Sequence, residues 1–148
     1  LAKRVAPHDI VGGVDNVTIH LAGGEDVPPT ADVDLMMTLD CLHDMPRPDL
    51  AMGAIRAAIS EDGTWLVKEI KSSPEWSKNL RNPMLAMMYS TSVASCMSSA
   101  MSSEDGLGLG TLGMNPAVLE SMVTDAGFTR FSMHDLDDPT NLYYEVRP

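Results

Sequence analysis

His43 is the residue of this sequence best suited to general acid–base chemistry, and it follows closely after the apolar run VDLMMTL (33–39). An unperturbed imidazole has a pKa of about 6.5, so it can take a proton from an acceptor group or orient that group near neutrality. The alternative is a structural histidine in a loop, hydrogen-bonded to Asp44 or to a backbone carbonyl. The residue type predicts a catalytic candidate and leaves the structural role open.

The glycine-rich stretch GLGLGTLG (106–113) fits the G-x-G-x-x-G spacing of a dinucleotide-binding loop. That spacing has physical meaning only where a strand delivers the glycines and a helix N-terminus receives the phosphate. The preceding residues read SSAMSSED, which is not a buried strand, and Asn115-Pro116 starts a helix of its own. We therefore predict a mobile connection here. A nicotinamide-dependent oxidoreductase is not supported, because no strand precedes the glycines.

The histidines and cysteines do not predict a metal site. Two His-Asp pairs occur, at 43–44 and 134–135, but they lie on different elements and lack the spacing of metal ligands. Cys96 has no base beside it in the sequence, so a buried inert thiol is the simpler interpretation. Cys41 and Cys96 also lack a disulfide framework, which favours the reducing cytoplasm over a secreted fold.

Composition limits the classes of partner. The chain has 148 residues, of which 44% are hydrophobic, as is typical of one globular domain. A formal net charge of −11 repels phosphate backbones and anionic lipid surfaces, so we expect neither direct nucleic-acid binding nor membrane binding. No apolar run approaches the roughly 18 residues of a membrane-spanning helix.

Hydrophobic periodicity predicts alternating strands and helices. Strands are expected at 16–22, 33–39, 64–70, 128–134 and 141–147, and the last two are expected to be antiparallel neighbours. Helices are expected at 1–11, 50–60 and 116–126, with a largely helical Met-, Ser- and Ala-rich stretch at 75–102. The run at 33–39 is nearly continuous, which is typical of a strand buried on both faces. With the helix at 50–60 and the strand at 64–70 it predicts a right-handed crossover.

Several segments together resemble the class I S-adenosylmethionine-dependent methyltransferases. They are LMMTLDCLHDM, AIRAAISEDGTWLVKEI, SKNLRNPMLAMMYSTSVASCMSSAM, GLGTLG, AGFTRF and YYEVRP. The chain looks most similar to bacterial methyltransferases that carry a winged-helix domain ahead of the catalytic domain. The resemblance implies a truncated Rossmann-like α/β sheet, made of the third to seventh strands with the last one antiparallel, and flanking helices. Residues 1–148 would then be a partial catalytic domain without the first two strands and the glycine-rich cofactor loop.

The same resemblance assigns candidate roles to particular residues. The family's adenine-binding acid aligns with Gly23, so Glu25 or Asp26 would have to substitute. Asp40, Cys41 and Leu42 match the segment on the cofactor side, and His43 is the catalytic candidate. The helical cover at about 75–113 implies substrate-binding residues Met87, Met88, Tyr89, Ser95, Cys96 and Ser99. Because methionine fills irregular cores as well as pockets, core packing is the alternative for those side chains.

The expected function is methyl transfer from S-adenosylmethionine to a small molecule, with this chain as an incomplete domain. The alternative is a noncatalytic, self-associating remnant of the fold. Without the glycine loop and the ribose-binding acid, this chain alone should bind the cofactor weakly or not at all. An exposed apolar edge at 33–39 favours pairing with another strand, so we expect a homodimer that buries apolar surface from residues 1–40.

Overall fold

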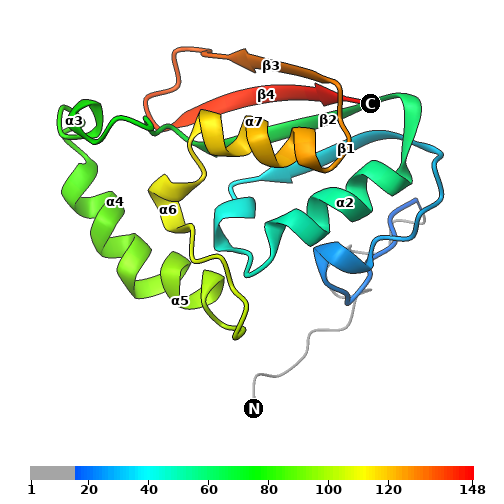
Figure 1. Ribbon diagram of the computed structural model, residues 1–148, viewed down its shortest axis with the longest axis horizontal. Helices are drawn as coiled ribbons and strands as arrows, with labels where there is room; N and C mark the ends of the chain where they lie inside the picture. The colour runs from blue at the N-terminus through cyan, green and yellow to red at the C-terminus, as the bar shows by residue number, and fades with distance from the viewer. Residues whose placement is uncertain (1–15) are drawn as a thin grey trace.

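The computed structural model of the chain describes residues 16–148, so the helix expected at 1–11 lies outside the described residues. Its centre is a four-stranded sheet in the order β1-β2-β4-β3 (Figure 1). The strands are β1 (Val33–Leu39), β2 (Ile59–Ile70), β3 (Arg130–His134) and β4 (Asn141–Arg147). β1 and β2 are parallel, whereas β4 is antiparallel to both β2 and β3. The α/β class with an antiparallel last strand is confirmed.

Two helices pack over the same face of this sheet, α2 (Pro48–Ala58) and α7 (Pro116–Asp125) (Figure 1). Each begins with proline, whose missing N–H costs nothing in the first turn. The Asn115 side chain caps α7 by accepting the Val118 N–H at 3.3 Å. Because α2 connects the parallel strands β1 and β2, the predicted strand–helix–strand crossover is present.

The hydrophobic core lies between the sheet and these two helices. Trp65 and Val67 of β2 pair with Val146 and Tyr144 of β4, and all four side chains are fully buried. The Trp65 ring packs 5.3 Å from the Phe128 ring, and its indole N–H donates to the Thr38 hydroxyl at 3.1 Å. The core therefore joins β1, β2 and β4 to the residues that follow α7.

The strand predicted at 16–22 is wrong. Residues 16–22 make no strand, and the side chains of Val17 and Leu21 are 48% and 79% exposed. An alternating pattern forms a strand only where an edge is available to complete the hydrogen-bonded ladder, and this segment has no strand partner within residues 16–148. The described part of the chain accordingly contains four of the five expected strands.

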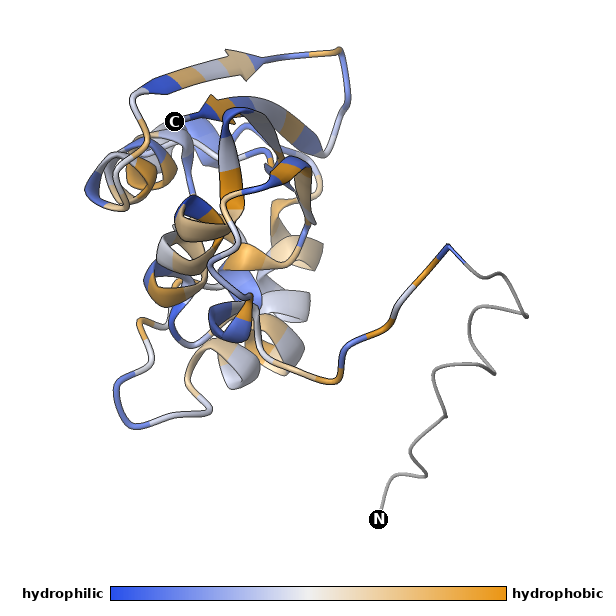
Figure 2. Cartoon of the chain, turned by 90° about the vertical axis from the view of Figure 1, so that its right-hand side faces the viewer, coloured by the Kyte–Doolittle hydropathy of each residue, from blue (hydrophilic) through white to orange (hydrophobic). Residues whose placement is uncertain are grey.

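The prediction that both faces of 33–39 are buried is also wrong. Met36 and Thr38 face the helices, whereas Leu35, Met37 and Leu39 are 55%, 55% and 53% exposed on the outer face. The hydropathy colouring of Figure 2 shows hydrophobic residues both on the strands and on the helices. The physical reason is that the described helices cover one face of the sheet. We call Leu35, Met37 and Leu39 the outer β1 patch.

β2 begins earlier than the predicted boundary at 64, because its first residues also reach β1. The register shifts between Val33 and Leu35, and Gly63 sits at this irregularity. A Cβ atom on Gly63 would lie 2.7 Å from the Val33 carbonyl oxygen, so glycine permits the close approach of the two strands.

The helical stretch predicted at 75–102 is divided into short pieces. They are α3 (Trp76–Asn79), α4 (Leu85–Thr91), the π-helical turn η3 (Ser92–Cys96) and α5 (Met97–Ala100). The short helix α6 (Gly110–Gly113) packs against η3. None of the helices in residues 16–148 combines the length and the hydropathy needed to cross a bilayer.

Candidate active site

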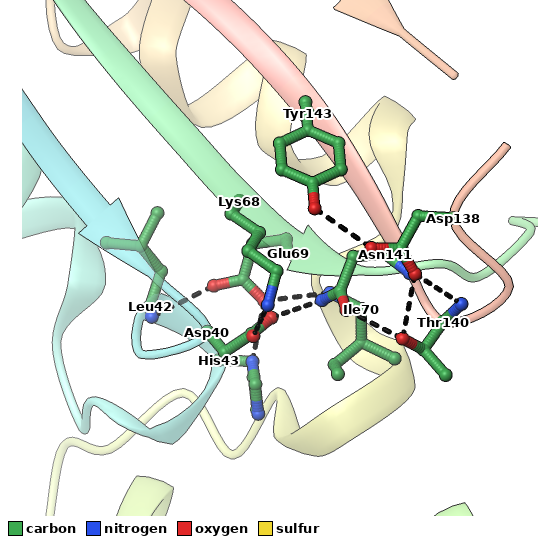
Figure 3. Close-up of polar contacts among 10 residues, drawn as sticks. All are labelled: Asp40, Leu42, His43, Lys68, Glu69, Ile70, Asp138, Thr140, Asn141 and Tyr143. Atoms are coloured by element: carbon green, nitrogen blue, oxygen red, sulfur yellow. Dashed lines mark hydrogen bonds and ion pairs between the residues drawn. The ribbon is translucent and has the colours of Figure 1, made fainter. Parts of the chain in front are cut away.

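The candidate site begins at the carboxyl end of β1, where Asp40 turns the chain out of the sheet. Asp40 has a positive φ of 51°, an uncommon conformation for a residue other than glycine. Its carboxylate accepts a hydrogen bond from Lys68 Nζ at 2.5 Å and another from the Asn141 side chain. These contacts from β2 and β4 hold the turn, so that the 3₁₀ turn η2 (Leu42–Asp44) points back over the sheet edge (Figure 3).

His43 in η2 forms a buried pair with Glu69 near the end of β2. Its Nδ1 lies 2.6 Å from Glu69 Oε2, and the exposed fractions are 4% for the His43 side chain and 1% for that of Glu69 (Figure 3). The other oxygen of Glu69 accepts the Leu42 N–H at 2.9 Å. Since the carboxylate is acceptor-only when ionised, it fixes a proton on Nδ1 and leaves Nε2 for other chemistry.

The charges around His43 favour its protonated form. Burial alone would lower the pKa of His43, but the hydrogen bond and charge of Glu69, with smaller contributions from Asp44 and Asp40, raise this pKa above its ordinary value. His43 thus combines a fixed tautomer with an increased affinity for a proton, the properties that a proton acceptor needs.

A second group of side chains lies on the Nε2 side of His43. Asp44 Oδ1 is 3.4 Å from Nε2, and the Cys96 thiol of η3 completes a cluster whose ligand atoms all lie within 4.8 Å of one another. The Thr111 hydroxyl of α6 donates to Cys96 Sγ at 3.1 Å. Burial raises the pKa of the Cys96 thiol, so the sulfur carries a proton at neutral pH.

The residues predicted to face the cofactor are divided between two places. Asp40, Cys41 and Leu42 do come together with His43, but Asp40 and the Leu42 amide are engaged in internal contacts. Glu25 and Asp26 lie in the 3₁₀ turn η1 (Gly24–Asp26), which packs on α2. Each of the two borders a hollow, of about 490 Å³ for Glu25 and about 390 Å³ for Asp26.

Of the residues predicted to bind substrate, Tyr89 lines a cavity of about 460 Å³ between the short helices. Met87 is 57% exposed, whereas Met88 is buried and its sulfur accepts from the Asn82 amide at 3.3 Å. Cys96 packs against α6 instead. Ser95 and Ser99 are exposed.

The cavity contains residues that sequence reasoning missed. Its walls include Trp76, Ser92, Val93, Met97, Leu109 and Asn115. The Trp76 and Tyr89 rings meet edge to face, with centroids 5.4 Å apart. The cavity is therefore mainly apolar with an aromatic pair in its wall.

Glu69 is the most important residue that the sequence interpretation missed. Its signal was present, because Trp65, Val67 and Glu69 alternate along one strand and must share a face. An acid that continues the buried face of a strand needs a partner in the interior, since an unpaired buried charge is very costly. That partner is His43.

The glycine-rich stretch packs one element against another. Helix α5 and a turn precede it, so the strand that a nucleotide-binding loop requires is replaced by a helix. Gly110 has a φ of +64°, and a Cβ atom there would lie 2.5 Å from Met97 Sδ. The Leu107 N–H donates to the Pro46 carbonyl at 2.9 Å. Gly110 thus allows α6 to approach η3 and α5 closely, which places Thr111 on Cys96.

No protein-family model matches the chain, and no curated protein matches it either. Solved structures do match. An O-methyltransferase family protein from Burkholderia thailandensis has a TM-score of 0.56 at 18% identity, over 95% of this chain and 37% of its own. Human N-acetylserotonin methyltransferase, solved with S-adenosylmethionine, has a TM-score of 0.55 at 18% identity, over 85% of this chain and 32% of its own.

A structure described as a pericyclic reaction enzyme matches as well, with a TM-score of 0.54 at 11% identity, over 85% of this chain and 29% of its own. This chain therefore spans well under half the length of these neighbours. The neighbours include S-adenosylmethionine-dependent methyltransferases, so the chain has the fold of the C-terminal part of such enzymes. At these identities the likeness concerns the fold alone, and the activity has to be argued from the site.

Proposed function

We propose that this chain is part of a methyltransferase that transfers a methyl group from S-adenosylmethionine to a hydroxyl oxygen of a small molecule. The observation that carries the proposal is the buried His43–Glu69 pair, which lies at the carboxyl edge of the parallel strands. Ligands of open α/β sheets bind at that edge. The methyltransferase fold of the neighbours supplies the context.

His43 is the proton acceptor in this proposal. Glu69 holds the Nδ1 proton, so Nε2 is the nitrogen that receives the proton of the acceptor hydroxyl. Asp44 stands 3.4 Å from Nε2 and its side chain is 39% exposed, so it can turn toward solvent and admit the acceptor. The acceptor oxygen forms the new bond to carbon as its proton passes to Nε2, and the imidazolium is stabilised by Glu69.

Glu25 and Asp26 are suited to contact the adenosine part of S-adenosylmethionine. Gly23 lets the Glu25 carboxylate fold back, because a Cβ atom on Gly23 would lie 2.6 Å from that carboxylate. Asp26 Oδ2 accepts the Gly23 N–H at 3.0 Å. Glu25 and Asp26 each border one of the two hollows next to η1. Glu25 and Asp26 would hold the adenosine side of S-adenosylmethionine. When bound, the cofactor supplies an electrophilic methyl group on its sulfonium.

The chain alone is expected to bind S-adenosylmethionine and S-adenosylhomocysteine weakly or not at all. Two acids on one short turn offer few contacts, and Asp40 is already occupied by Lys68 and Asn141. Isothermal titration should give no saturable heat up to about 1 mM ligand, which corresponds to binding weaker than about −4 kcal/mol. Tight stoichiometric binding would contradict the expectation and make η1 a sufficient site.

Transfer itself is tested by supplying labelled S-adenosylmethionine and a panel of hydroxylated small molecules. The assay uses this chain and any longer polypeptide that contains it, and it measures the methylated product together with S-adenosylhomocysteine. Product in either form supports the proposal. Absence of product in both would favour the second candidate, a noncatalytic, self-associating remnant of the fold, which the exposed outer β1 patch favours.

We also propose that the chain forms a homodimer through β1. Within residues 16–148, β1 is paired on one side only, and the outer β1 patch leaves three apolar side chains about half exposed. Residues 16–22 do not close this edge as a strand, and an exposed apolar edge of this kind favours pairing with a strand of a second copy. Two copies of one edge strand pair across a two-fold axis.

Leu35→Lys is expected to convert this dimer into a monomer, because it places a charge in the middle of the apolar contact. Leu35 is opposite Thr64 on β2, so the lysine creates no like-charge pair within one chain. Light scattering at micromolar concentration should report twice the mass of one chain for the wild type. The matched control is Leu136→Lys, at a leucine that is 65% exposed in a loop. A monomeric wild type, or an equal effect of both variants, would contradict the proposal.

Two finer expectations rest on the resemblance and on the thiols. We infer a relation to bacterial methyltransferases that carry a winged-helix domain ahead of the catalytic domain. We also infer a cytoplasmic location, because Cys41 and Cys96 are both free thiols in the fold, and such thiols persist in a reducing compartment.

A further inference from the structure

Three potential metal ligands from two separate elements meet beside the Nε2 atom of His43. They are His43 Nε2, Asp44 Oδ1 and Cys96 Sγ, all within 4.8 Å of one another. His43 and Cys96 are buried, and Asp44 is partly buried. Residue spacing did not predict this cluster, because Cys96 lies on η3, far along the chain from η2. The cluster forms because α6 packs against both η2 and η3.

The spacing of the nitrogen and the oxygen is that of two ligands on one metal. Bonds of about 2.0–2.1 Å at a tetrahedral angle separate neighbouring nitrogen and oxygen ligands of zinc by about 3.3–3.4 Å. His43 Nε2 and Asp44 Oδ1 are 3.4 Å apart. The Cys96 sulfur lies within 4.8 Å of both atoms, so a side-chain movement that brings it to bonding distance would complete a three-ligand set and leave the fourth position to a water molecule.

Asp44 Oδ1 is the second indication of a bound cation. This oxygen is buried and has no hydrogen-bond partner among the described residues. Because Glu69 fixes the proton on Nδ1 of His43, the neutral imidazole presents its Nε2 lone pair toward this carboxylate oxygen. Two electron-rich atoms this close are stabilised by a hydrogen or a positive charge beside them, which is a proton on Nε2, the Cys96 thiol hydrogen or a metal ion.

The surroundings of the cluster match the outer contacts of a metal site. Histidines that ligate metals commonly donate their second ring N–H to a carboxylate, as His43 does to Glu69 at 2.6 Å. The Thr111 hydroxyl donates to Cys96 Sγ at 3.1 Å, which orients the sulfur and stabilises it as a thiolate. Both outer contacts come from elements other than η2, so the fold positions the ligands without the metal.

We propose that His43 Nε2, Asp44 Oδ1 and Cys96 Sγ bind a divalent metal of intermediate softness, with Zn²⁺ as the best match. A thiolate and an imidazole select zinc over Mg²⁺ and Ca²⁺, which require oxygen ligands. The carboxylate and the thiolate together neutralise the two positive charges of the ion. Binding releases the Cys96 thiol proton and any proton held on Nε2.

This inference does not rest on the proposed methyl transfer, and it predicts a conflict with it. A metal on Nε2 uses the lone pair that would accept the proton of the methyl acceptor. The metal-loaded form is therefore inactive as a transferase, so Zn²⁺ acts as an inhibitor. Metal binding is measured by spectroscopy and methyl transfer by the formation of product. Each proposal can therefore fail without affecting the test of the other.

The test is titration of the metal-free chain with Co²⁺ under reducing, oxygen-free conditions. We expect a sulfur-to-cobalt charge-transfer band and intense visible bands of tetrahedral Co²⁺, saturating at one ion per chain and lost when Zn²⁺ is added. Cys96→Ser should abolish the charge-transfer band. Thr111→Val should keep the band and weaken binding by roughly 10- to 100-fold, because it removes an outer contact only.

Cys41→Ser is the matched control, because Cys41 is the other free thiol and lies next to η2. It should leave the band and the affinity unchanged. A folded wild type without the band would overturn the proposal and leave a proton as the charge between Nε2 and Asp44. A band that survives in Cys96→Ser, or that is lost in Cys41→Ser instead, would also overturn it.

Discussion

His43→Gln is expected to lower the turnover of methyl transfer by about 10²- to 10⁴-fold, the usual contribution of a general base. Glutamine keeps the size and polarity of the side chain and can still donate to Glu69, but it cannot take up a proton. Since His43 is assigned to the acceptor, the affinity for S-adenosylmethionine should change much less than turnover. The measurement is a comparison of kcat and KM in whichever form of the protein transfers methyl groups.

His134→Gln is the matched control for this prediction. His134 is 48% exposed on β3 and its Nε2 lies 4.0 Å from Glu145, so it has an acidic neighbour but no buried setting. Its replacement should leave both kinetic constants unchanged. Equal losses of turnover and of cofactor affinity in His43→Gln would contradict a role at the acceptor, and unchanged turnover would remove His43 from catalysis.

The sequence predicted most of the fold because local signals and global packing agree in the second half of the chain. Asn115-Pro116 starts a helix and Gly127 follows it, and the structure has α7 between them. The strands at the C-terminus also follow their alternating patterns. These elements were predictable because each buries its apolar side on the same core, so local preference and tertiary contacts favour one structure.

Residues 16–22 and 33–39 show where this reasoning fails. Alternation at 16–22 indicates a strand, but a strand needs a paired edge, and pairing is not encoded in the segment itself. The apolar run at 33–39 predicts burial on two faces, yet burial depends on what covers the strand. Within residues 16–148 the covering helices lie on one side. Both errors concern β1 and its surroundings, whereas β2 and β4 are covered as expected.

The candidate site was predictable in part. His43 closely follows an apolar run of strand length, so its position at the sheet edge could be predicted from the sequence. The two contacts that define its chemistry could not be assigned, because Glu69 and Cys96 reach His43 only after β2 and η3 take their places. For the substrate residues, helical spacing alone did not separate Tyr89, which lines the cavity, from Met88, which is buried.

Glu69→Ala is expected to lower the free energy of unfolding by about 3–5 kcal/mol, the usual cost of removing one partner of a buried charged pair. Glu69 is fully buried and accepts both from His43 Nδ1 and from the Leu42 N–H, so alanine leaves two buried donors without an acceptor. It also leaves a cavity under η2. Glu69→Gln keeps an oxygen for Leu42 and should lose less.

Glu61→Ala is the control for this last prediction, since Glu61 has the same side chain on the same strand. It is 84% exposed and lies 3.4 Å from Arg56, so its removal should cost at most about 0.5 kcal/mol. The free energy of unfolding of both variants is measured by urea unfolding. All samples have the same protein concentration, so that dimer formation affects the compared values in the same way. An equal decrease in the free energy of unfolding of the two variants would mean that Glu69 does not hold η2 to the sheet. Glu69 would then not explain the orientation of His43.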